Sequence, residues 1–273
     1  MERIQSAIAK ARAARQEGAV RSPFKLPSAT SRNSAVQAAW ASLPERTLDA
    51  SRVERNRLVA SAPGADSTPF DVMRTNLVRH LREHDWTRVA ITSPGSGVGK
   101  TTTCINLALS LARQRELRVI VLELDLRRPS IQKILGVLPT ANLSDVMRGT
   151  VAPEDGLVRI RPNLAVGMNA EPATNPAELL SSTQAAAAID AIEIRYRPDV
   201  ILLDMPPVLV IDDALAFLDQ VDCALMVAAA EQSTVAEIDR AGKAVSDHTK
   251  VLGVILNKCR YMDKSEGYGH DGY

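Results

Sequence analysis

The stretch ITSPGSGVGKTTT at residues 91–103 decides the fold that we expect for this chain. It reads as the end of a buried strand, a glycine-rich turn and the start of a helix, which is the context of a phosphate-binding loop. Successive backbone N–H groups in such a turn form an anion site, and Gly97 and Gly99 let the backbone approach phosphate oxygens closely. Lys100 then supplies a charge for the outer phosphates, and Thr101 supplies a hydroxyl for Mg²⁺.

The loop departs from the strict pattern at one position, because Pro94 stands where a glycine is usual. The alternative is a glycine- and serine-rich loop that precedes a lysine by chance, and the flanking strand and helix argue against it. We therefore expect the phosphates of ATP to bind the loop and the first helical turn, at Gly97, Val98, Gly99, Lys100, Thr101 and Thr102.

The composition excludes several classes of protein. The 273 residues are 45% hydrophobic, which suits one large domain with additional segments. No run of about eighteen apolar residues occurs and the first residues lack the apolar core of a signal peptide, so we expect neither a transmembrane segment nor secretion. Cys104, Cys223 and Cys259 form no Cys-x-x-Cys pair, and we expect all three to be reduced and buried in a cytosolic protein.

The net charge of +1 hides an uneven distribution. Residues 1–65 carry eleven Lys and Arg against five Asp and Glu, whereas residues 66–273 carry twenty-two against twenty-seven. A basic arm joined to an acidic globule could approach anionic lipid, a partner protein or its own globule. The alternative is a solvated linker that happens to be rich in arginine.

The chain divides into four expected parts. Apolar residues on one side predict a short amphipathic helix over residues 1–17. Residues 18–65 are rich in Ser, Pro, Arg and Ala without steady periodicity, which predicts a flexible linker. A P-loop domain is expected over residues 66–258, followed by a flexible tail at residues 259–273.

Strand-like and helix-like segments alternate through the expected domain. Continuous Val, Ile and Leu runs separated by helices predict an α/β fold with a mostly parallel sheet covered by helices on both faces. The expected strands are 89–92, 119–124, 164–166, 200–203, 223–229 and 251–256, and the expected helices are 101–115, 177–196 and 234–246. In such a sheet the ligand lies at the carboxyl ends of the strands.

Acidic residues follow two of these strands. Glu123 and Asp125 leave the second strand, and Asp204 ends the strand that precedes two prolines. Carboxylates at this edge of the sheet can hold Mg²⁺, so we expect the metal at Thr101, Asp125 and Asp204. A lone acid in such a place is often only a helix cap, but three acids after two strands favour the metal site.

The last strand and the tail add a second set of candidates. Asn257 ends the strand and has an amide able to read an adenine edge, although Asn is also a common strand terminator. Three of the four tyrosines, Tyr261, Tyr268 and Tyr273, lie in the last thirteen residues and could accept phosphate. A parallel last strand would release this tail on the nucleotide face, and the alternative is a floppy end with incidental tyrosines.

Taken together, these motifs resemble those of the bacterial tyrosine kinases of polysaccharide synthesis, the BY-kinases. The resemblance runs from about Ser67 to Tyr273, and the short separate chain looks most like the form associated with exosortase and exopolysaccharide loci. Its motifs are RTNL at 74–77, the phosphate loop, DLRRP at 125–129, LSDVMRG at 143–149, NPAELL at 175–180, DMPPVL at 204–209, GVILNK at 253–258 and the tyrosines.

The resemblance implies an ATP-dependent autokinase that phosphorylates its tail tyrosines, usually between neighbouring subunits, and regulates exopolysaccharide synthesis or export. It implies a separately encoded membrane activator of the chain-length-determinant type, and hence a cytoplasmic protein recruited to the inner face of the membrane. No nucleic acid is expected among its partners. The family's catalytic and metal-binding positions fall on Lys100, Thr101, Glu123, Asp125 and Asp204 of this chain.

A tyrosine hydroxyl needs a base at neutral pH, because its ordinary pKa is about 10. Asp125 is the first candidate and Glu123 the second, while Arg127 or its neighbour Arg128 would fix the loop or meet a neighbour's phosphate. The family usually has Asp where Glu123 stands, and its tail usually holds a denser tyrosine cluster. The family's N-terminal helix usually carries Glu, Arg and Arg three residues apart for ring assembly, and this chain has Thr68, Asp71 and Arg74 at those positions. Ring formation through that helix is therefore not expected.

Two other functions stay open at this point. A partition-type ATPase would carry a signature lysine where this chain has Gly95. A scaffold that binds ATP without catalysis is the second alternative, and the replacement of the family's Asp by Glu123 keeps it open. His80 and His84 have a spacing that can bind metal, but their charged neighbours favour an exposed helix face.

Overall fold

The computed structural model describes residues 29–259, so the expected helix at residues 1–17 and the three tail tyrosines lie outside the described part. The chain divides into two compact units, residues 1–37 and residues 38–273. Helix α2 (Ala29–Ser42) crosses their boundary. Across residues 29–259, no helix combines the length and the apolar character that crossing a membrane requires.

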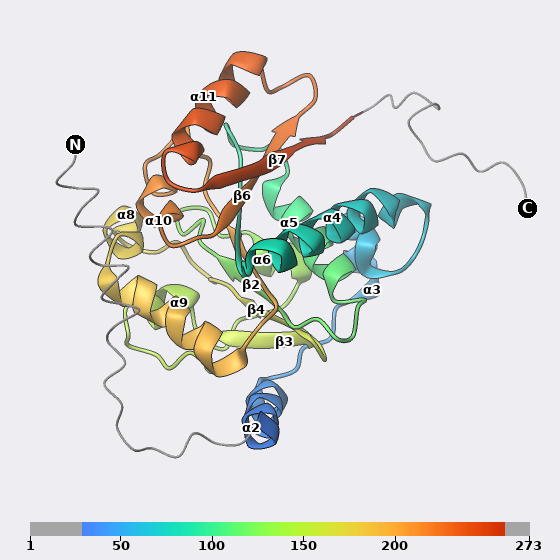
Figure 1. The fold of residues 1–273 in the computed structure, drawn as a ribbon, viewed down its shortest axis with the longest axis vertical. Helices are drawn as coiled ribbons and strands as arrows, with labels where there is room; N and C mark the ends of the chain where they lie inside the picture. Colours follow the sequence, from blue (N-terminus) through green and yellow to red (C-terminus); the bar gives the residue numbers. More distant parts are fainter. Residues whose placement is uncertain (1–28, 260–273) are drawn as a thin grey trace, which may run out of the picture. The chain divides into compact units, whose positions relative to one another are not determined.

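The second unit is built on a seven-stranded sheet of order β3-β4-β2-β5-β1-β6-β7 (Figure 1). All neighbouring strands are parallel except β3 and β4, which are antiparallel. The strands are β1 (Arg88–Thr92), β2 (Val119–Glu123), β3 (Leu157–Arg161), β4 (Leu164–Gly167), β5 (Val200–Asp204), β6 (Cys223–Ala229) and β7 (Lys250–Asn257).

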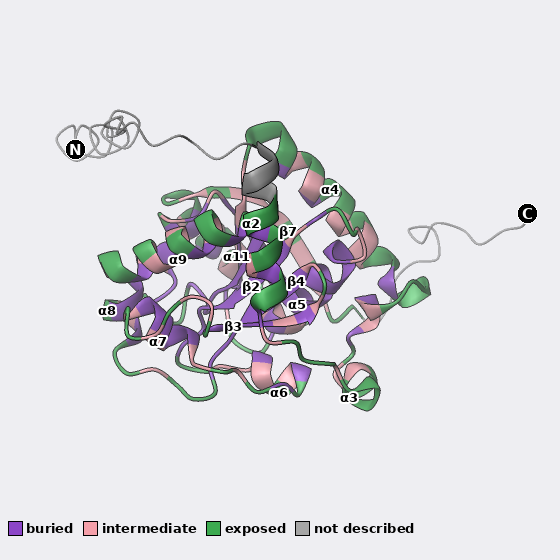
Figure 2. Ribbon diagram, turned by 90° about the horizontal axis from the view of Figure 1, so that it is seen from below, coloured by how far each residue is buried: buried purple, intermediate pink, exposed green. Residues whose placement is uncertain are grey.

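Helices cover both faces of this sheet. Every residue of the central strands β2 and β5 is buried, which requires cover on each side, and Figure 2 shows the burial along the chain. The expected α/β fold is therefore confirmed. The helices are α3 (Ala50–Arg55), α4 (Thr68–His84), α5 (Lys100–Leu111), α6 (Ile131–Leu135), α7 (Leu143–Met147), α8 (Pro176–Leu180), α9 (Thr183–Tyr196), α10 (Leu215–Leu218) and α11 (Val235–Ser246).

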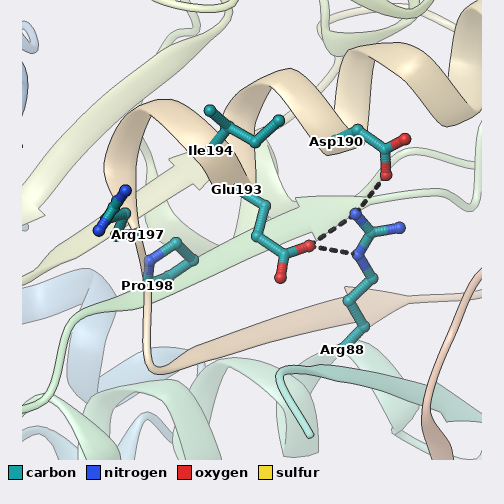
Figure 3. A pocket seen from close by; sticks show the side chains of 6 residues that line it. All are labelled: Arg88, Asp190, Glu193, Ile194, Arg197 and Pro198. Carbon is teal, nitrogen blue, oxygen red and sulfur yellow. Dashed lines mark hydrogen bonds and ion pairs between the residues drawn. The ribbon is translucent and has the colours of Figure 1, made fainter. Parts of the chain in front are cut away.

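The helix expected over residues 177–196 is two helices. Helix α8 ends at Leu180, and the side chain of Ser182 accepts a hydrogen bond from the backbone N–H of Ala185 to cap the start of α9. At the other end of α9, Asp190 and Glu193 both pair with Arg88 at the start of β1, with N–O distances of 2.6 Å (Figure 3). These ion pairs tie α9 to the end of the sheet where the strands begin.

The prediction of a flexible linker over residues 18–65 is wrong for residues 38–65, which belong to the second unit. Trp40 is buried and its indole N–H donates to the carbonyl oxygen of Tyr196, and the backbone at Glu45 pairs with Arg159 of β3. Leu58 and Ala60 are fully buried in the core. Periodicity was missing because the segment consists of the end of α2, the short helix α3, which buries no residue, and single turns such as the 3₁₀ turn at Val59–Ser61, which buries Ala60.

The cysteines also differ from the expectation in one case. All three are free thiols, and Cys104 and Cys223 are buried as expected, but Cys259 is exposed. It follows the last strand, where the chain has already left the sheet.

Candidate active site

The phosphate loop joins β1 to α5 in the conformation that its glycines allow. Gly97 and Gly99 have φ angles of +75° and +92°, which residues with a side chain rarely adopt. A Cβ atom on Gly99 would also lie 2.3 Å from the amide nitrogen of Asn257. Helix α5 begins at Lys100, so its first backbone N–H groups face the loop, which is the geometry that an anion site requires.

Lys100 and Asp125 form an ion pair at this edge of the sheet. The ammonium nitrogen lies 2.7 Å from Asp125 Oδ2, and both side chains are largely buried. Burial alone would lower the pKa of Lys100, but Asp204 and Asp125 raise it above its ordinary value. The lysine is therefore held charged where a phosphate would bind.

Asp204 lies beside this pair and is the least satisfied group of the site. It ends β5 in register with Glu123, and its carbonyl oxygen accepts the backbone N–H of Asp125 at 3.0 Å. Its side chain is fully buried, and neither carboxylate oxygen meets hydrogen-bond geometry with any described residue. Burial raises the pKa of Asp204 to about 6, against the opposing effects of Lys100 and of the nearby Thr101 hydroxyl.

This arrangement fits a magnesium ion. A buried carboxylate whose oxygens make no close hydrogen bond is free to bind a cation, and Mg²⁺ prefers oxygen ligands from carboxylates and hydroxyls. The oxygens of Asp204 and Thr101 meet this requirement, and Asp125 completes the expected set.

Glu123 has a structural role in this geometry. Its Oε1 accepts the backbone N–H groups of Ser130 and Ile131 at 2.5 and 2.7 Å, and its Oε2 accepts that of Asn169 at 2.8 Å. Burial raises the pKa of Glu123 to about 7, although these three N–H groups favour the ionised form. Both oxygens are engaged, so the side chain fixes the loop after β2.

Arg127 is likewise engaged by the protein. Its guanidinium donates to both carboxylate oxygens of the buried Asp213, at 2.6 and 3.0 Å. This two-point contact joins the loop after β2 to the loop after β5. Of the two functions that the sequence left open for this arginine, fixing the loop is the one that these contacts support.

The end of β7 lies against the phosphate loop. The amide of Asn257 donates to the carbonyl oxygen of Val98 at 2.8 Å, and the ammonium of Lys258 donates to that of Gly97 at 2.7 Å. Adenine recognition by Asn257 stays a prediction, because the amide N–H₂ group is bound to the loop here. The strand is parallel to β6, as expected, so the chain leaves the sheet beside the nucleotide loop.

Sequence reasoning missed three residues that organise this site. Asn169 and Asp213 hold the two acidic loops, and Lys258 holds the phosphate loop. Asn169 and Asp213 belong to none of the quoted motifs, whereas Lys258 ends the GVILNK motif. The position of Lys258 directly after Asn257 was the one available signal, because the end of a parallel strand lies where the ligand binds.

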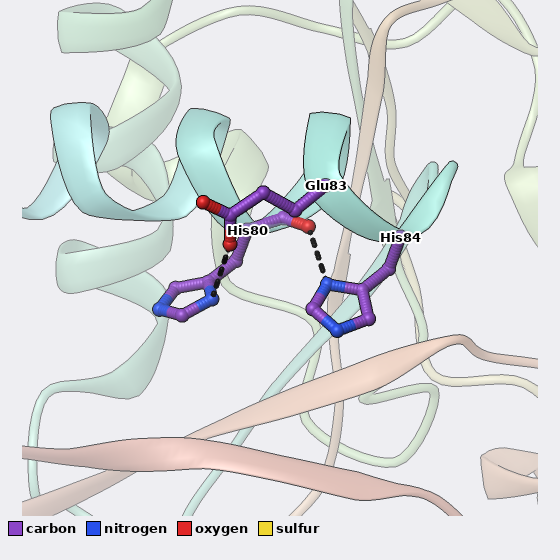
Figure 4. A group of neighbouring side chains, drawn as sticks. All are labelled: His80, Glu83 and His84. Atoms are coloured by element: carbon purple, nitrogen blue, oxygen red, sulfur yellow. Dashed lines mark hydrogen bonds and ion pairs between the residues drawn. The ribbon is translucent and has the colours of Figure 1, made fainter.

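Two other sequence features lie on α4. The ligand atoms of His80, Glu83 and His84 come within 4.8 Å of one another (Figure 4), yet Glu83 and His84 are exposed. The favoured interpretation, an exposed helix face, therefore fits this group better than a metal site. Asp71 and Arg74, which replace the assembly motif, turn onto α5, where Asp71 accepts the hydroxyl of Ser110 at 2.6 Å.

Comparison with known proteins identifies the family. A family model described as ParA, NUBPL iron-transfer P-loop NTPase, matches residues 86–271. The chain belongs to this ParA family. Within it, the resemblance to the bacterial tyrosine kinases is also confirmed, because the curated relatives reported below carry that name.

Two curated relatives and one solved structure illustrate this. The putative tyrosine-protein kinase AmsA of Erwinia amylovora is 30% identical over 220 residues, which cover 79% of this chain but only 30% of AmsA. The tyrosine-protein kinase YwqD of Bacillus subtilis is 29% identical, and the match covers 81% of this chain and 93% of YwqD. The VpsO kinase domain is 28% identical with a TM-score of 0.63, covering 76% of this ParA-family chain and 98% of VpsO.

Proposed function

We propose that this chain is an ATP-dependent protein-tyrosine autokinase that phosphorylates the tyrosines of its C-terminal segment. One observation carries the proposal: Asn257 and Lys258, at the end of β7, are hydrogen-bonded to the phosphate loop. The fourteen residues after Cys259 contain three tyrosines and start at the nucleotide site. At about 3.3–3.6 Å per extended residue, they can reach this site or that of a second copy.

The chemistry follows from the placement of the charged groups. The phosphates of ATP bind at residues 97–102, where the start of α5 and Lys100 offset the charge that builds on the transferring group. The tyrosine oxygen attacks the γ-phosphorus, the bond from that phosphorus to the bridging oxygen breaks, and ADP leaves. Asp125 takes the phenolic proton, and it becomes available when Lys100 turns from it toward a phosphate.

Asp204 and Thr101 would hold Mg²⁺, with Asp125 as a further ligand. The ion supplies positive charge to the phosphate oxygens during transfer. Glu123 and Arg127 act as positioning residues in this proposal, because both are bound to other parts of the protein.

The biological setting is proposed from the relatives. Tyrosine-protein kinases of this kind carry names such as CapB and EpsB, and a solved relative at 24% identity is the chimera CapA2B2. We propose that a neighbouring copy presents the acceptor tyrosine and that a membrane protein of the chain-length-determinant type activates the kinase from the cytoplasmic side. The regulated process would be exopolysaccharide synthesis or export.

The alternatives receive less support. The chain has Gly95 where a partition-type ATPase has its signature lysine, and it has no Cys-x-x-Cys pair to hold an iron–sulfur cluster for iron transfer. A scaffold that only binds ATP would need Lys100 and Asp204 as well, so the formation of phosphotyrosine is what distinguishes it from the kinase.

Phosphotyrosine blotting of the purified chain tests the proposal. After incubation with Mg·ATP, the wild type should gain phosphotyrosine, and Lys100→Met should gain none. Hydrolysis of ATP without phosphotyrosine would favour the partition-type ATPase, and neither reaction, with or without an activator fragment, would favour the scaffold.

A further inference from the structure

We propose that Leu209 and Val210 form an acceptor platform that binds the ring of a tyrosine from the C-terminal segment of a second copy. This inference rests on the proposed function and names the surface that recognises its protein substrate. These two residues, called the acceptor platform below, lie in the loop between β5 and α10, where the DMPPVL motif ends at Leu209, and neither has a role in the chemistry described above.

The acceptor platform runs beside the first half of the phosphate loop. The backbone N–H of Val208 donates to the carbonyl oxygen of Ser93 at 2.9 Å, and that of Leu209 donates to the carbonyl oxygen of Pro94 at 3.3 Å. The far end of the same loop is fixed by the contact between Asp213 and Arg127. Both ends of this loop are therefore held, and the backbone of Leu209 is bonded directly to the phosphate loop.

Both side chains of the acceptor platform face solvent. Leu209 is 37% exposed and Val210 is 57% exposed, whereas the preceding Val208 is only 5% exposed. Adjacent apolar side chains beside a nucleotide loop gain free energy when another apolar surface covers them, at about 25 cal/mol for each Å² removed from water. A tyrosine ring offers a flat apolar surface with its hydroxyl at the far edge, which leaves that hydroxyl free to reach the phosphate.

The origin of the ring follows from where the C-terminal segment starts. Asn257 and Lys258 contact Val98 and Gly97, in the second half of the phosphate loop, whereas the acceptor platform contacts its first half. The segment of the same chain therefore starts at the other half of this loop. We assign the occupant to a second copy, because the proposed function has a neighbouring copy present the acceptor tyrosine, and the mixing experiment below distinguishes it from the segment of the same chain.

A mixing experiment with full-length chains tests this assignment. The donor carries Tyr261→Ala, Tyr268→Ala and Tyr273→Ala, so it cannot label itself, and the acceptor carries Lys100→Met, so it cannot transfer phosphate. Phosphotyrosine on the acceptor is measured against acceptor concentration, and the affinity of the donor for ATP is measured separately by fluorescence.

Leu209→Ser with Val210→Ser in the donor should raise the acceptor concentration for half-maximal rate about tenfold, the equivalent of about 1.4 kcal/mol, with unchanged ATP affinity. The apolar exchange Leu209→Met with Val210→Ile should restore the wild-type value. Ile194→Ser on α9 is the matched control, because Ile194 is 73% exposed and lies with Arg88 near the start of β1; it should change nothing.

If the acceptor concentration for half-maximal rate is unchanged in the serine variant, the acceptor platform is overturned. It is also overturned if the variant loses affinity for ATP by the same factor, because the loop then only supports the nucleotide. Wild-type chain that labels itself but never labels the Lys100→Met acceptor would overturn the assignment to a second copy. Absence of phosphotyrosine on every chain, the unmodified wild type included, would instead overturn the proposed function.

Discussion

At the scale of single residues, the site combines two buried acids with opposite hydrogen bonding. Asp204 is buried without a hydrogen-bond partner among the described residues, whereas Glu123, its register neighbour, accepts three backbone N–H groups. Their positions in the sequence, each at the end of an apolar run, gave no means of distinguishing them. The difference arises from the loop after β2, whose path depends on tertiary contacts.

Asp204→Asn should stabilise the nucleotide-free protein while abolishing tyrosine phosphorylation. The pKa of Asp204 is about 6 in the folded protein against an ordinary 3.8, which corresponds to a cost of about 3 kcal/mol for the ionised form. Between these values the folded state binds more protons than the unfolded state, so this contribution to stability falls as pH rises from about 4 to 6 and stays low above that.

Chemical denaturation of both proteins at about pH 8 and about pH 4 measures this effect. The gain in the free energy of unfolding should be present at the higher pH and absent at the lower. A variant that is less stable than the wild type at the higher pH would contradict the account.

Asp125→Asn and Glu123→Gln should differ strongly in phosphotransfer. Asp125 is the proposed base, so its replacement should lower the transfer rate by roughly 10²–10⁴. Glu123→Gln keeps the shape of a side chain that only positions the loop, so its rate should stay within about tenfold of the wild type. Single-turnover kinetics at saturating ATP compare the two. A large loss in Glu123→Gln with none in Asp125→Asn would assign the base to Glu123, and equal losses would contradict this division of roles.

At the scale of elements, strands were predictable where burial on both faces leaves a continuous apolar run, as in β2 and β5. Strand β3 was missed because its sequence, LVRIR, interrupts the apolar run with arginine at the edge of the sheet. The segment 38–65 was missed for another reason: its order depends on partners far along the chain, such as Tyr196 for Trp40. No local pattern records such contacts.

Asn106→Ala tests whether this segment is docked on the helix that follows the phosphate loop. The Asn106 side chain on α5 accepts the backbone N–H of Ala60 and donates to the carbonyl oxygen of Arg57, both at 3.0 Å. Its removal leaves the buried N–H of Ala60 without this partner, so the free energy of unfolding should fall by about 1–3 kcal/mol.

The exposed Asn76 on α4 provides the control, because Asn76→Ala removes the same side chain from a helix surface. Thermal unfolding should show a lower Tm for Asn106→Ala alone. Equal Tm values for the two variants would mean that residues 57–60 contribute nothing to the stability of the domain.

At the scale of the whole molecule, the order of motifs along the chain carried more information than any one of them. The phosphate loop alone predicted a nucleotide site, and the parallel last strand predicted that its end would lie beside that loop, which the contacts of Asn257 and Lys258 confirm. The roles of Glu123 and Arg127 were not predictable in the same way, because they depend on Asn169 and Asp213, which come from distant loops.

The central claim is that the nucleotide site transfers phosphate to the C-terminal segment that starts beside it. Intact-mass spectrometry of the purified chain after incubation with Mg·ATP tests this most directly. The account predicts one to three added phosphates, which tandem fragmentation places on Tyr261, Tyr268 and Tyr273, and none on the Lys100→Met variant. Consumption of ATP with no added mass, or the same added phosphates on Lys100→Met, would contradict it.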